Sequence, residues 1–324
     1  MAGKVIGYGD TKAERGEFKF GPLKAVELPD GTPINFPLMI LNGKHEGPVL
    51  TLVSTMHGQE ITGIEVIRRI VREKVKAENL KGAIVAIPIG NPLAYHHSAY
   101  VTPYDSGNMA KSFPGRPAGF TTSRMASTLW QVIQNSDCYI DLHCIPLAVP
   151  HLIVNRYSSK EMEGTVKKSL ELAKAFGFPI LMKRDNEIDQ SFPMSCANAK
   201  GIPSFVVEFN DWKIWTKTNA NRGMRGVLNV MKTLGMIEGK VEEQSDVPYP
   251  KGPFFSKLIT ANKGGIVHPT RELGQKVTKG EELARILNPY GDVVETVTAP
   301  VDGYVGSYCF VENQAIPTGD YVVF

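Results

Sequence analysis

The spacing of hydrophobic residues along the chain predicts strands and helices in alternation. The run "VLTLV" (residues 49–53) is continuously apolar, as in a strand buried on both faces. From Glu60 to Val75 apolar residues recur at three- and four-residue steps, which predicts one buried helix face. Further strands are predicted at "AIVAIPIG", "DCYIDLH" and "IPSFVVEF", and further helices at "SRMASTLWQVIQ", "GTVKKSLELAKAFG" and "NANRGMRGVLNVMKTLG".

This alternation is typical of α/β proteins. For residues 1–245 we expect a mixed, mainly parallel sheet covered by helices. After the polar link "EGKVEEQSDVPYPKGP" no helical pattern of any length returns. Turn motifs such as "NKGG", "NPYGD" and "PVDG" recur at strand-length spacing within residues 253–324, which predicts a small C-terminal all-β domain.

Composition narrows the classes of partner and compartment. The 36 Lys and Arg residues exceed the 33 Asp and Glu residues by three and are scattered, so nucleic acid and membrane partners are not expected. The N-terminus lacks an apolar core of signal-peptide length and the four cysteines form no CxxC pair, which favours a cytoplasmic protein with reduced thiols. A homo-oligomer is left open.

Two histidines and a carboxylate follow predicted strands at positions suited to a metal. His57 and Glu60 come just after "VLTLV", and His143 ends the strand "YIDLHC". In open α/β sheets ligands bind outside the carboxyl ends of the strands. Two His and one Glu form a common catalytic zinc ligand set, so we predict one Zn²⁺ per chain. Gly58 is expected to allow a tight turn, and Asp141 to accept the second ring N–H of a ligand histidine.

Glu208 ends the apolar run "GIPSFVVEF", where burying an unpaired carboxylate is costly. It could be a salt-bridged or capping residue. Alternatively, it is a general base that takes a proton from zinc-bound water and passes it to the leaving amine. A histidine at a strand end is often an ordinary polar residue, and HxxE alone is a weak motif. The residues by themselves leave both interpretations open.

Five motifs together resemble the succinylglutamate desuccinylase/aspartoacylase family of the zinc carboxypeptidase superfamily: "HGQEITG", "NPLAY", "DSGNMAKSFPG", "IDLHC" and "GIPSFVVEF". They occur in that family's order and approximate spacing over residues 30–240. The resemblance implies a zinc-carboxypeptidase-like fold with His57, Glu60 and His143 as zinc ligands and Glu208 as the catalytic carboxylate. It also implies that zinc-activated water hydrolyses the amide bond of a small N-acylated amine or amino acid.

The chain departs from that family at the substrate-binding positions. Members typically carry an arginine that polarises the scissile carbonyl and an Asn-Arg pair that binds a substrate carboxylate. Alignment places Tyr100 at the first position, and Ala110 and Lys111 at the pair. Because Lys lacks the planar fork of Arg, we expect either a substrate without the usual free carboxylate or a point-charge contact from Lys111. Tyr100 is expected to help stabilise the oxyanion, and Asn108 to shape the loop and contact substrate.

Neighbouring polar residues receive lesser roles. Arg116 and Arg124 are alternative anion or oxyanion donors, although surface salt bridges suit them better. One of His96 and His97 is a further candidate for substrate contact. Cys144 follows the ligand histidine directly but lacks a free histidine base, so a packed thiol is expected.

The C-terminal module resembles a lipoyl- or biotinyl-like fold around "TAPVDGYVG". Such carriers present a modifiable lysine at a hairpin tip, and "YGDVVETVTAPVDG" has none, so a lid, spacer or oligomer contact is expected instead. Two alternatives to a deacylase are a metallocarboxypeptidase and a non-catalytic metal- or ligand-binding relative. The missing Asn-Arg pair argues against the first, and the retained Glu208 against the second.

Overall fold

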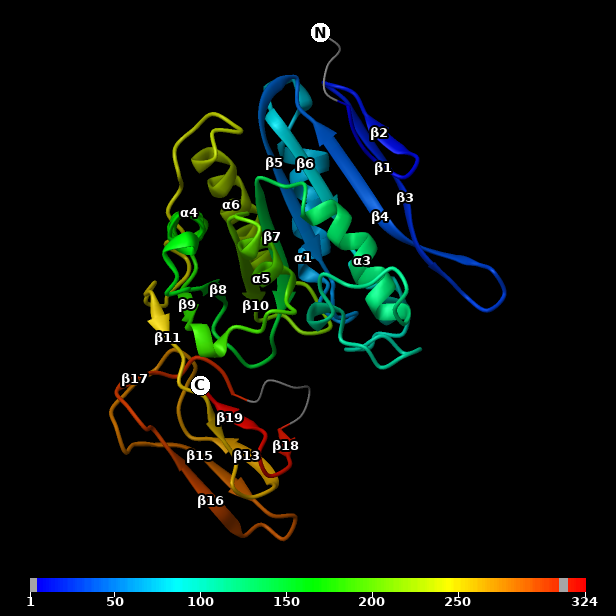
Figure 1. The fold of residues 1–324 in the computed structure, drawn as a ribbon. Coiled ribbons are helices and arrows are strands. Elements are labelled where there is room, and N and C mark those ends of the chain that lie inside the picture. Colours follow the sequence, from blue (N-terminus) through cyan, green and yellow to red (C-terminus); the bar gives the residue numbers. More distant parts are fainter. Residues whose placement is uncertain (1–4, 309–313) are drawn as a thin grey trace.

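The computed structural model of the protein describes residues 5–308 and 314–324, and a nine-stranded sheet lies at its centre (Figure 1). In spatial order its strands are β11 (Phe254–Phe255), β9 (Ile180–Lys183), β8 (His151–Asn155), β10 (Ser204–Phe209), β7 (Cys138–Cys144), β5 (His45–Ser54), β6 (Lys81–Ile87), β4 (Pro33–Asn42) and β3 (Phe18–Glu27). A short hairpin of β1 (Ile6–Tyr8) and β2 (Thr11–Ala13) precedes them.

The sheet is mixed and mainly parallel, as predicted. The central strands β6, β5, β7 and β10 run parallel to one another, and so do β8, β9 and β11. Antiparallel pairing joins β10 to β8, β6 to β4 and β4 to β3. Five of the eight neighbouring pairs in the described sheet are therefore parallel.

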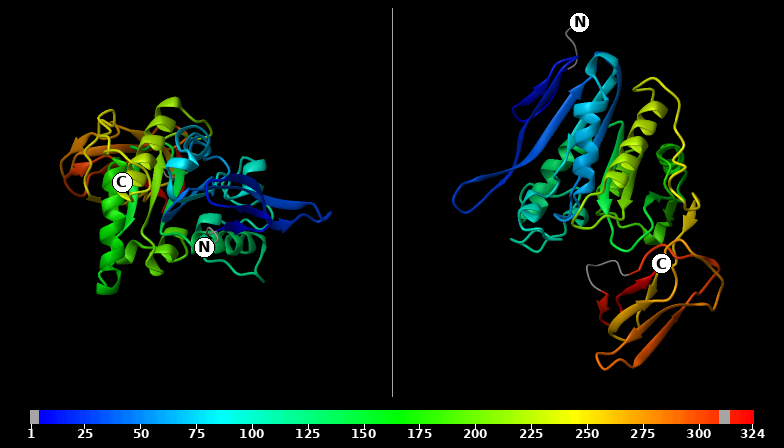
Figure 2. Two further views of the ribbon diagram at one scale, coloured as in Figure 1. Left: turned by 90° about the horizontal axis from the view of Figure 1, so that it is seen from above. Right: turned by 180° about the vertical axis from the view of Figure 1, so that it is seen from behind.

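Helices cover both faces of the sheet (Figures 1 and 2). Residues of α1, α4 and α6 share one buried apolar cluster with the sheet, and residues of α3 share a second cluster on the opposite face. The helices are α1 (Thr62–Arg69), α2 (Pro92–His96), α3 (Thr121–Ile133), α4 (Glu163–Phe176), α5 (Pro193–Ala199) and α6 (Lys217–Thr233).

The apolar periods locate most of these elements to within a few residues. The helix expected after Glu60 begins at Thr62, and its last turn widens to a π-helix over Ile70–Lys74. α4 ends at Gly177, whose φ of 96° is the left-handed conformation expected of a glycine C-cap. The long stretch without a period, residues 91–119, holds only α2 and one short 3₁₀ turn, Met109–Lys111.

The C-terminal residues form small sheets with their own apolar core. A four-stranded sheet has the order β16-β15-β13-β18, and β12-β19 and β14-β17 are two-stranded. Their bounds are β12 (Ile259–Thr260), β13 (Gly265–Pro269), β14 (Lys276–Val277), β15 (Glu282–Leu287), β16 (Val293–Thr298), β17 (Gly303–Tyr304), β18 (Ala315–Ile316) and β19 (Tyr321–Val323). The predicted all-β module is present. β11, just before it, pairs with β9 and so extends the large sheet.

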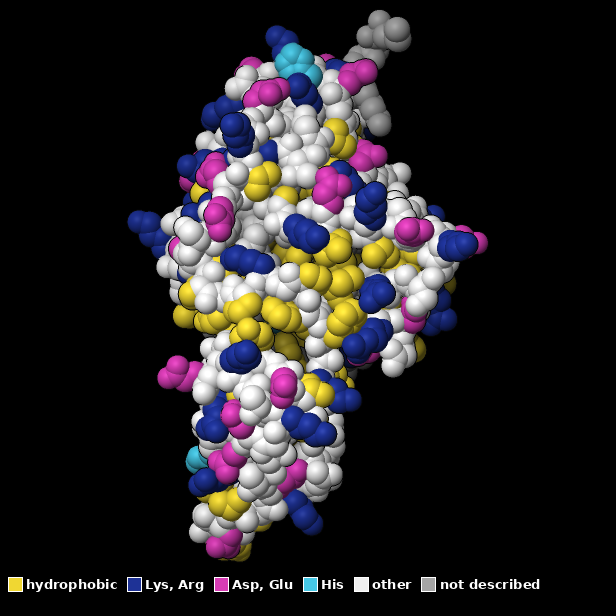
Figure 3. Space-filling model, turned by 90° about the vertical axis from the view of Figure 1, so that its left-hand side faces the viewer, with side chains coloured by type: hydrophobic (Ala, Val, Ile, Leu, Met, Phe, Trp, Pro, Cys, Tyr) yellow, Lys and Arg dark blue, Asp and Glu magenta, His cyan; other side chains and the backbone are white. Residues whose placement is uncertain are grey.

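Hydrophobic side chains gather where the large sheet meets the module, and the surface is hollowed there (Figure 3). A cavity of about 340 Å³ at this junction has a mostly apolar lining that includes Tyr249, Phe254, Val301 and Tyr304. It is larger than the cavity described below. Its described lining holds one histidine, His151, and one carboxylate, Asp302. None of the helices in the described chain is both long enough and apolar enough to cross a membrane.

His151 lies at this junction. Its ring is buried, its Nδ1 lies 2.8 Å from the carbonyl oxygen of Val149, and it meets the ring of Phe324 edge-on at a centroid distance of 5.7 Å. Burial lowers the pKa of His151 to about 4. The folded protein therefore keeps this imidazole neutral at pH values where an unfolded chain would protonate it.

Acidification should destabilise the protein through His151. Below pH 6.5 the unfolded state binds more protons than the folded state, so the free energy of unfolding falls as pH falls, by up to about 1.4 kcal/mol per pH unit until pH 4. His151→Gln should lose less stability than the wild type between pH 7 and pH 5 in urea denaturation. The exposed His268 supplies the control, because His268→Gln should follow the wild type. An unchanged pH dependence in His151→Gln would contradict the assignment.

Candidate active site

The carboxyl ends of neighbouring parallel strands carry the predicted site residues. His57 and Glu60 lie in the loop from β5 to α1, and His143 lies at the end of β7, the strand next to β5. Glu208 lies on β10, on the other side of β7, and its Cα is paired with that of His143. The sheet therefore brings together side chains that are far apart in sequence.

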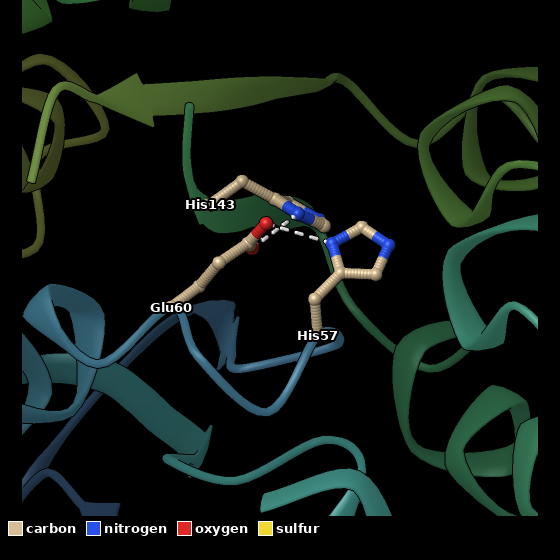
Figure 4. Close-up of side chains that lie close together, drawn as sticks. All are labelled: His57, Glu60 and His143. Atoms are coloured by element: carbon tan, nitrogen blue, oxygen red, sulfur yellow. Dashed lines mark hydrogen bonds and ion pairs between the residues drawn. The ribbon is translucent and has the colours of Figure 1, made fainter. Parts of the chain in front are cut away.

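The three predicted ligands converge on one point (Figure 4). Nδ1 of His57 lies 2.8 Å from Oε1 of Glu60, and Nδ1 of His143 lies 2.8 Å from Oε2 of the same carboxylate. One ligand atom from each residue lies within 4.8 Å of the others, and all three residues are buried. Their role as metal ligands stays a prediction that this convergence supports.

Each imidazole has an oxygen beside its outer nitrogen. Nε2 of His57 lies 3.2 Å from Oδ1 of Asn108, and Nε2 of His143 lies 3.2 Å from Oδ2 of Asp141. An acceptor at Nε2 favours a proton there and leaves the Nδ1 lone pair directed toward Glu60. Asp141 and Asn108 each lie beside a predicted ligand, and the orienting role of Asp141 stays a prediction.

The charges at the site fit a divalent cation. Burial alone raises the pKa of Glu60, but the charges of His57 and His143 outweigh it and hold this pKa at about 2. Burial likewise lowers the pKa of His143, yet Asp141 and Glu60 outweigh it and raise this pKa well above its usual range. The buried carboxylates are thus stabilised by positive charge nearby. A bound metal ion can supply this charge in place of protons on the two histidines. Two imidazole nitrogens and one carboxylate suit zinc.

Glu208 has the environment of a group that exchanges protons. Its Oε2 atom is buried and, among the described residues, has no hydrogen-bond partner. Burial raises the pKa of Glu208 to about 8, with Glu60 and Asp141 adding to the rise and His143 opposing it. A nearby divalent cation would lower this value toward neutrality, which is the range that suits a general base.

A cavity of about 140 Å³ opens onto these groups. Besides the three predicted ligands, its lining includes Glu208, Tyr100, Ile153, Lys183, Val206 and Trp212.

Tyr100 stacks against a predicted ligand. Its ring is nearly parallel to that of His57, with centroids 3.9 Å apart and planes inclined by 12°. Burial raises the pKa of the Tyr100 hydroxyl, and Glu60 adds to this rise, so the group stays protonated as a hydrogen-bond donor. This position is compatible with the predicted contact to a substrate carbonyl.

The other predicted substrate contacts lie farther out. Lys111 is exposed and is not among the lining residues, and Ala110 beside it is buried in the apolar cluster beneath α3. Arg116 and Arg124 are exposed, and Nε of Arg124 donates to the carbonyl oxygen of Gly119 at 2.7 Å. Contact of Lys111 with substrate stays a prediction.

A known protein family matches the part of the chain that carries these residues. The model of the succinylglutamate desuccinylase/aspartoacylase catalytic domain matches residues 46–234, more than half of the chain. The chain belongs to the succinylglutamate desuccinylase/aspartoacylase family. The resemblance and the predicted enzyme class, a hydrolase of non-peptide amide bonds, are thereby confirmed.

Several relatives of the family are similar over most of the chain. The N-alpha-acetyl-L-2,4-diaminobutyric acid deacetylase of Halomonas elongata is 27% identical over 267 residues, 79% of this chain and 74% of that enzyme. A succinylglutamate desuccinylase/aspartoacylase structure from Rhodobacter sphaeroides has a TM-score of 0.82 at 23% identity and covers 94% of both chains. The product-bound ectoine utilization protein EutE (DoeB) from Ruegeria pomeroyi also scores 0.82, at 21% identity, over 95% of this chain and 94% of that one.

The fold similarity extends beyond the family. A metallo-carboxypeptidase from Burkholderia cenocepacia has a TM-score of 0.52 at 13% identity, over 67% of this chain and 64% of that one. At such identity the likeness concerns the fold alone. It confirms the predicted zinc-carboxypeptidase-like architecture.

Sequence reasoning missed four polar residues of the cavity, which are Asn155, Lys183, Asp189 and Ser195. Asn155 and Lys183 end the neighbouring strands β8 and β9, where their Cα atoms are paired. Each follows a short apolar run, "HLIV" and "ILM", which is the same pattern that led to His143 and Glu208. The same pattern therefore marks Asn155 and Lys183 in the sequence. It does not show that they face this cavity, because β8 and β9 run antiparallel to β10 and the sequence does not reveal that orientation.

The loop between β5 and α1 is tightly constrained. Thr55, a β-branched residue, has a φ of 58°, and its hydroxyl donates to the carbonyl oxygen of Glu60 at 2.8 Å. A Cβ atom on Gly58 would lie 2.1 Å from the carbonyl oxygen of Ala94 and 2.2 Å from its carbonyl carbon. Gly58 is thus required by close backbone contact, since its φ is not among the positive values.

Gly58→Ala should therefore push the loop away from α2 and displace His57. We expect a loss of unfolding free energy on the order of 1–3 kcal/mol, the usual cost of overpacking, together with weaker zinc binding. Thermal unfolding and zinc titration measure the two effects. Gly164→Ala is a matched control: this helical glycine has open space around its Cβ position, so the change should be neutral or stabilising. Equal behaviour of both variants would contradict the proposed constraint.

Proposed function

We propose that the protein is a zinc-dependent amidohydrolase that removes the acyl group from a small N-acylated amine or amino acid. The observation that carries this proposal is the convergence of His57, Glu60 and His143 beside Glu208, at the wall of a small cavity. Family membership supports the reaction class. The relative from Halomonas elongata, a deacetylase of an N-acetylated diamino acid, supports a small substrate.

The chain's residues divide the work among them. His57, Glu60 and His143 would hold the zinc ion, which when bound polarises a carbonyl and lowers the pKa of water. Glu208 takes the proton of the attacking water and delivers it to the nitrogen of the leaving amine. Tyr100, held against the ring of His57, donates a hydrogen bond from its hydroxyl to the oxygen on which negative charge develops.

The missing Asn-Arg pair argues against the alternative of a metallocarboxypeptidase acting on peptide C-termini. The region that would bear the family's Asn-Arg pair presents a buried Ala110 and an exposed Lys111. A role restricted to metal or ligand binding gives no reason for Glu208, since a buried carboxylate oxygen such as its Oε2, without a hydrogen-bond partner among the described residues, is costly. We retain the cytoplasm as the predicted location.

Metal analysis tests the first half of the proposal. The purified protein should contain about one zinc ion per chain, and removal by a chelator should abolish hydrolysis of N-acylated substrates until zinc is added back. Glu60→Gln should lose most of the bound zinc because it removes the negative charge shared by both histidines. Full activity of a metal-free protein would overturn the proposal.

Glu208→Gln tests the second half. The variant should keep its zinc while kcat falls by about 10²–10⁴-fold, the usual contribution of general acid–base catalysis. Steady-state kinetics and metal content measured on the same sample separate the two effects. Glu171→Gln, a change of an exposed glutamate on α4, should leave both unchanged. A kcat of Glu208→Gln within a few-fold of the wild type would rule out the assignment.

A further inference from the structure

Lys183, the last residue of β9, lines the catalytic cavity with its positive charge unpaired. Among the described residues, no carboxylate oxygen forms an ion pair with its ammonium group. The contact that the ammonium makes is with the ring of Phe192, whose centroid lies 5.5 Å from Nζ and which also lines the cavity. This aromatic face helps to orient the side chain.

The surroundings of Lys183 call for an anion. Burial lowers the pKa of Lys183 and the charge of Lys111 adds to this fall, while the charges of Glu208, Asp189 and Glu187 oppose it. Removing an ammonium group from water without a partner is costly. Glu208 cannot serve as a permanent partner if it must accept protons. The carboxylate of Asp189, at the cavity's edge, accepts two hydrogen bonds from Ser191 on its Oδ1 atom, and in the described part of the chain it forms no ion pair with Lys183.

The strand register places Lys183 at the far end of the cavity from the predicted base. On β8 the residue opposite Glu208 is His151 and the residue opposite Lys183 is Asn155, so the two levels are 155 − 151 = 4 residues apart. That spacing is about 13 Å along the strand direction, and the long side chain of lysine shortens the gap. Lys183 and Glu208 are also close enough to affect each other electrostatically.

A second polar group at this end lacks a partner. Asn155 is buried, and its amide nitrogen lies 3.0 Å from Oγ of Ser195, but its Oδ1 atom has no hydrogen-bond partner among the described residues. An unpaired cation and an unpaired amide oxygen in one cavity indicate that a polar ligand group completes them.

We infer that Lys183 is the specificity-determining residue that binds a carboxylate of the substrate and selects N-acylated amino acids over N-acylated amines. This inference rests on the proposed function. It assigns the binding of a substrate carboxylate, which the missing Asn-Arg pair performs in the family, to Lys183 on β9. Lys183 binds as a point charge, so its selectivity depends on distance more than on the planar geometry of a guanidinium. The exposed Lys111 is left outside this contact.

The test compares two substrates that differ only in the carboxylate. N-alpha-acetyl-2,4-diaminobutyrate and N-acetyl-1,3-diaminopropane carry the same acetamide and the same free amine. In Lys183→Gln, kcat/KM for the first should fall by about 10- to 100-fold, mainly through KM, as expected for loss of a buried charge-assisted hydrogen bond. The value for the second should change less than about threefold. Lys183→Arg should restore part of the preference, and Lys174→Gln, an exposed change on α4, should alter neither substrate.

Three results would overturn the inference while leaving the hydrolase intact. One is an equal loss of kcat on both substrates in Lys183→Gln, which would mean that Lys183 acts through Glu208. Another is a preference that depends on Lys111→Gln and not on Lys183→Gln. The third is a wild-type enzyme that hydrolyses both compounds equally well.

Binding measurements keep the inference separate from the proposed reaction. Calorimetry on zinc-loaded Glu208→Gln should show tighter binding of N-acetylated amino acids than of the matched amines, and adding Lys183→Gln should remove the difference. This result would support the role of Lys183 even if no tested compound were hydrolysed, an outcome that would count against the proposed function alone. Equal binding of the two compound classes would count against Lys183.

Discussion

The carboxylate of Glu60, held between two imidazole rings, is the interaction on which the site depends. Its two oxygens each face one Nδ1 atom, 2.8 Å away, and it is buried. Because Asn108 and Asp141 lie at the outer nitrogens of His57 and His143, both rings are directed inward. A buried carboxylate is tolerated only when positive charge compensates it. The negative charge of Glu60 is compensated either by protonated imidazoles or by a bound cation. The same arrangement of side chains therefore suits both the metal-free and the metal-bound protein.

The register of the central strands converts this cluster into a reactive site. Parallel pairing of β7 with β10 sets Glu208 beside His143, and parallel pairing of β5 with β7 brings the loop of His57 and Glu60 to the same edge. Side chains alternate between faces, so a shift of one residue in β10 would turn Glu208 away and present Val207 instead. The apolar clusters on both faces fix that register. The packing of the core thus fixes the register of β10, and this register in turn places Glu208 beside His143.

The sequence predicts features that lie within one loop or strand, but it does not show which distant strands pair in the sheet. The short step from His57 to Glu60 and the alternation of Asp141 and His143 are legible because each lies within one loop or strand. The order and direction of the strands cannot be predicted in this way, since β8 and β9 run antiparallel to β10. That reversal carries Lys183 into the cavity. Alignment with a family likewise assigns Tyr100 a place in a motif but cannot show its ring lying on that of His57.

The small module is hydrogen-bonded to the segment that follows β7. The backbone N–H of Val149 donates to the carbonyl oxygen of Gly306 at 2.8 Å, and that of Tyr308 to the carbonyl oxygen of Leu147 at 2.9 Å. These bonds hold the connection between β7 and β8, the two strands on either side of β10. Since β10 bears Glu208, fixing that connection stiffens the wall of the cavity on both sides of the base. These bonds tie the module to the wall of the cavity, while its role as a lid, spacer or oligomer contact stays a prediction.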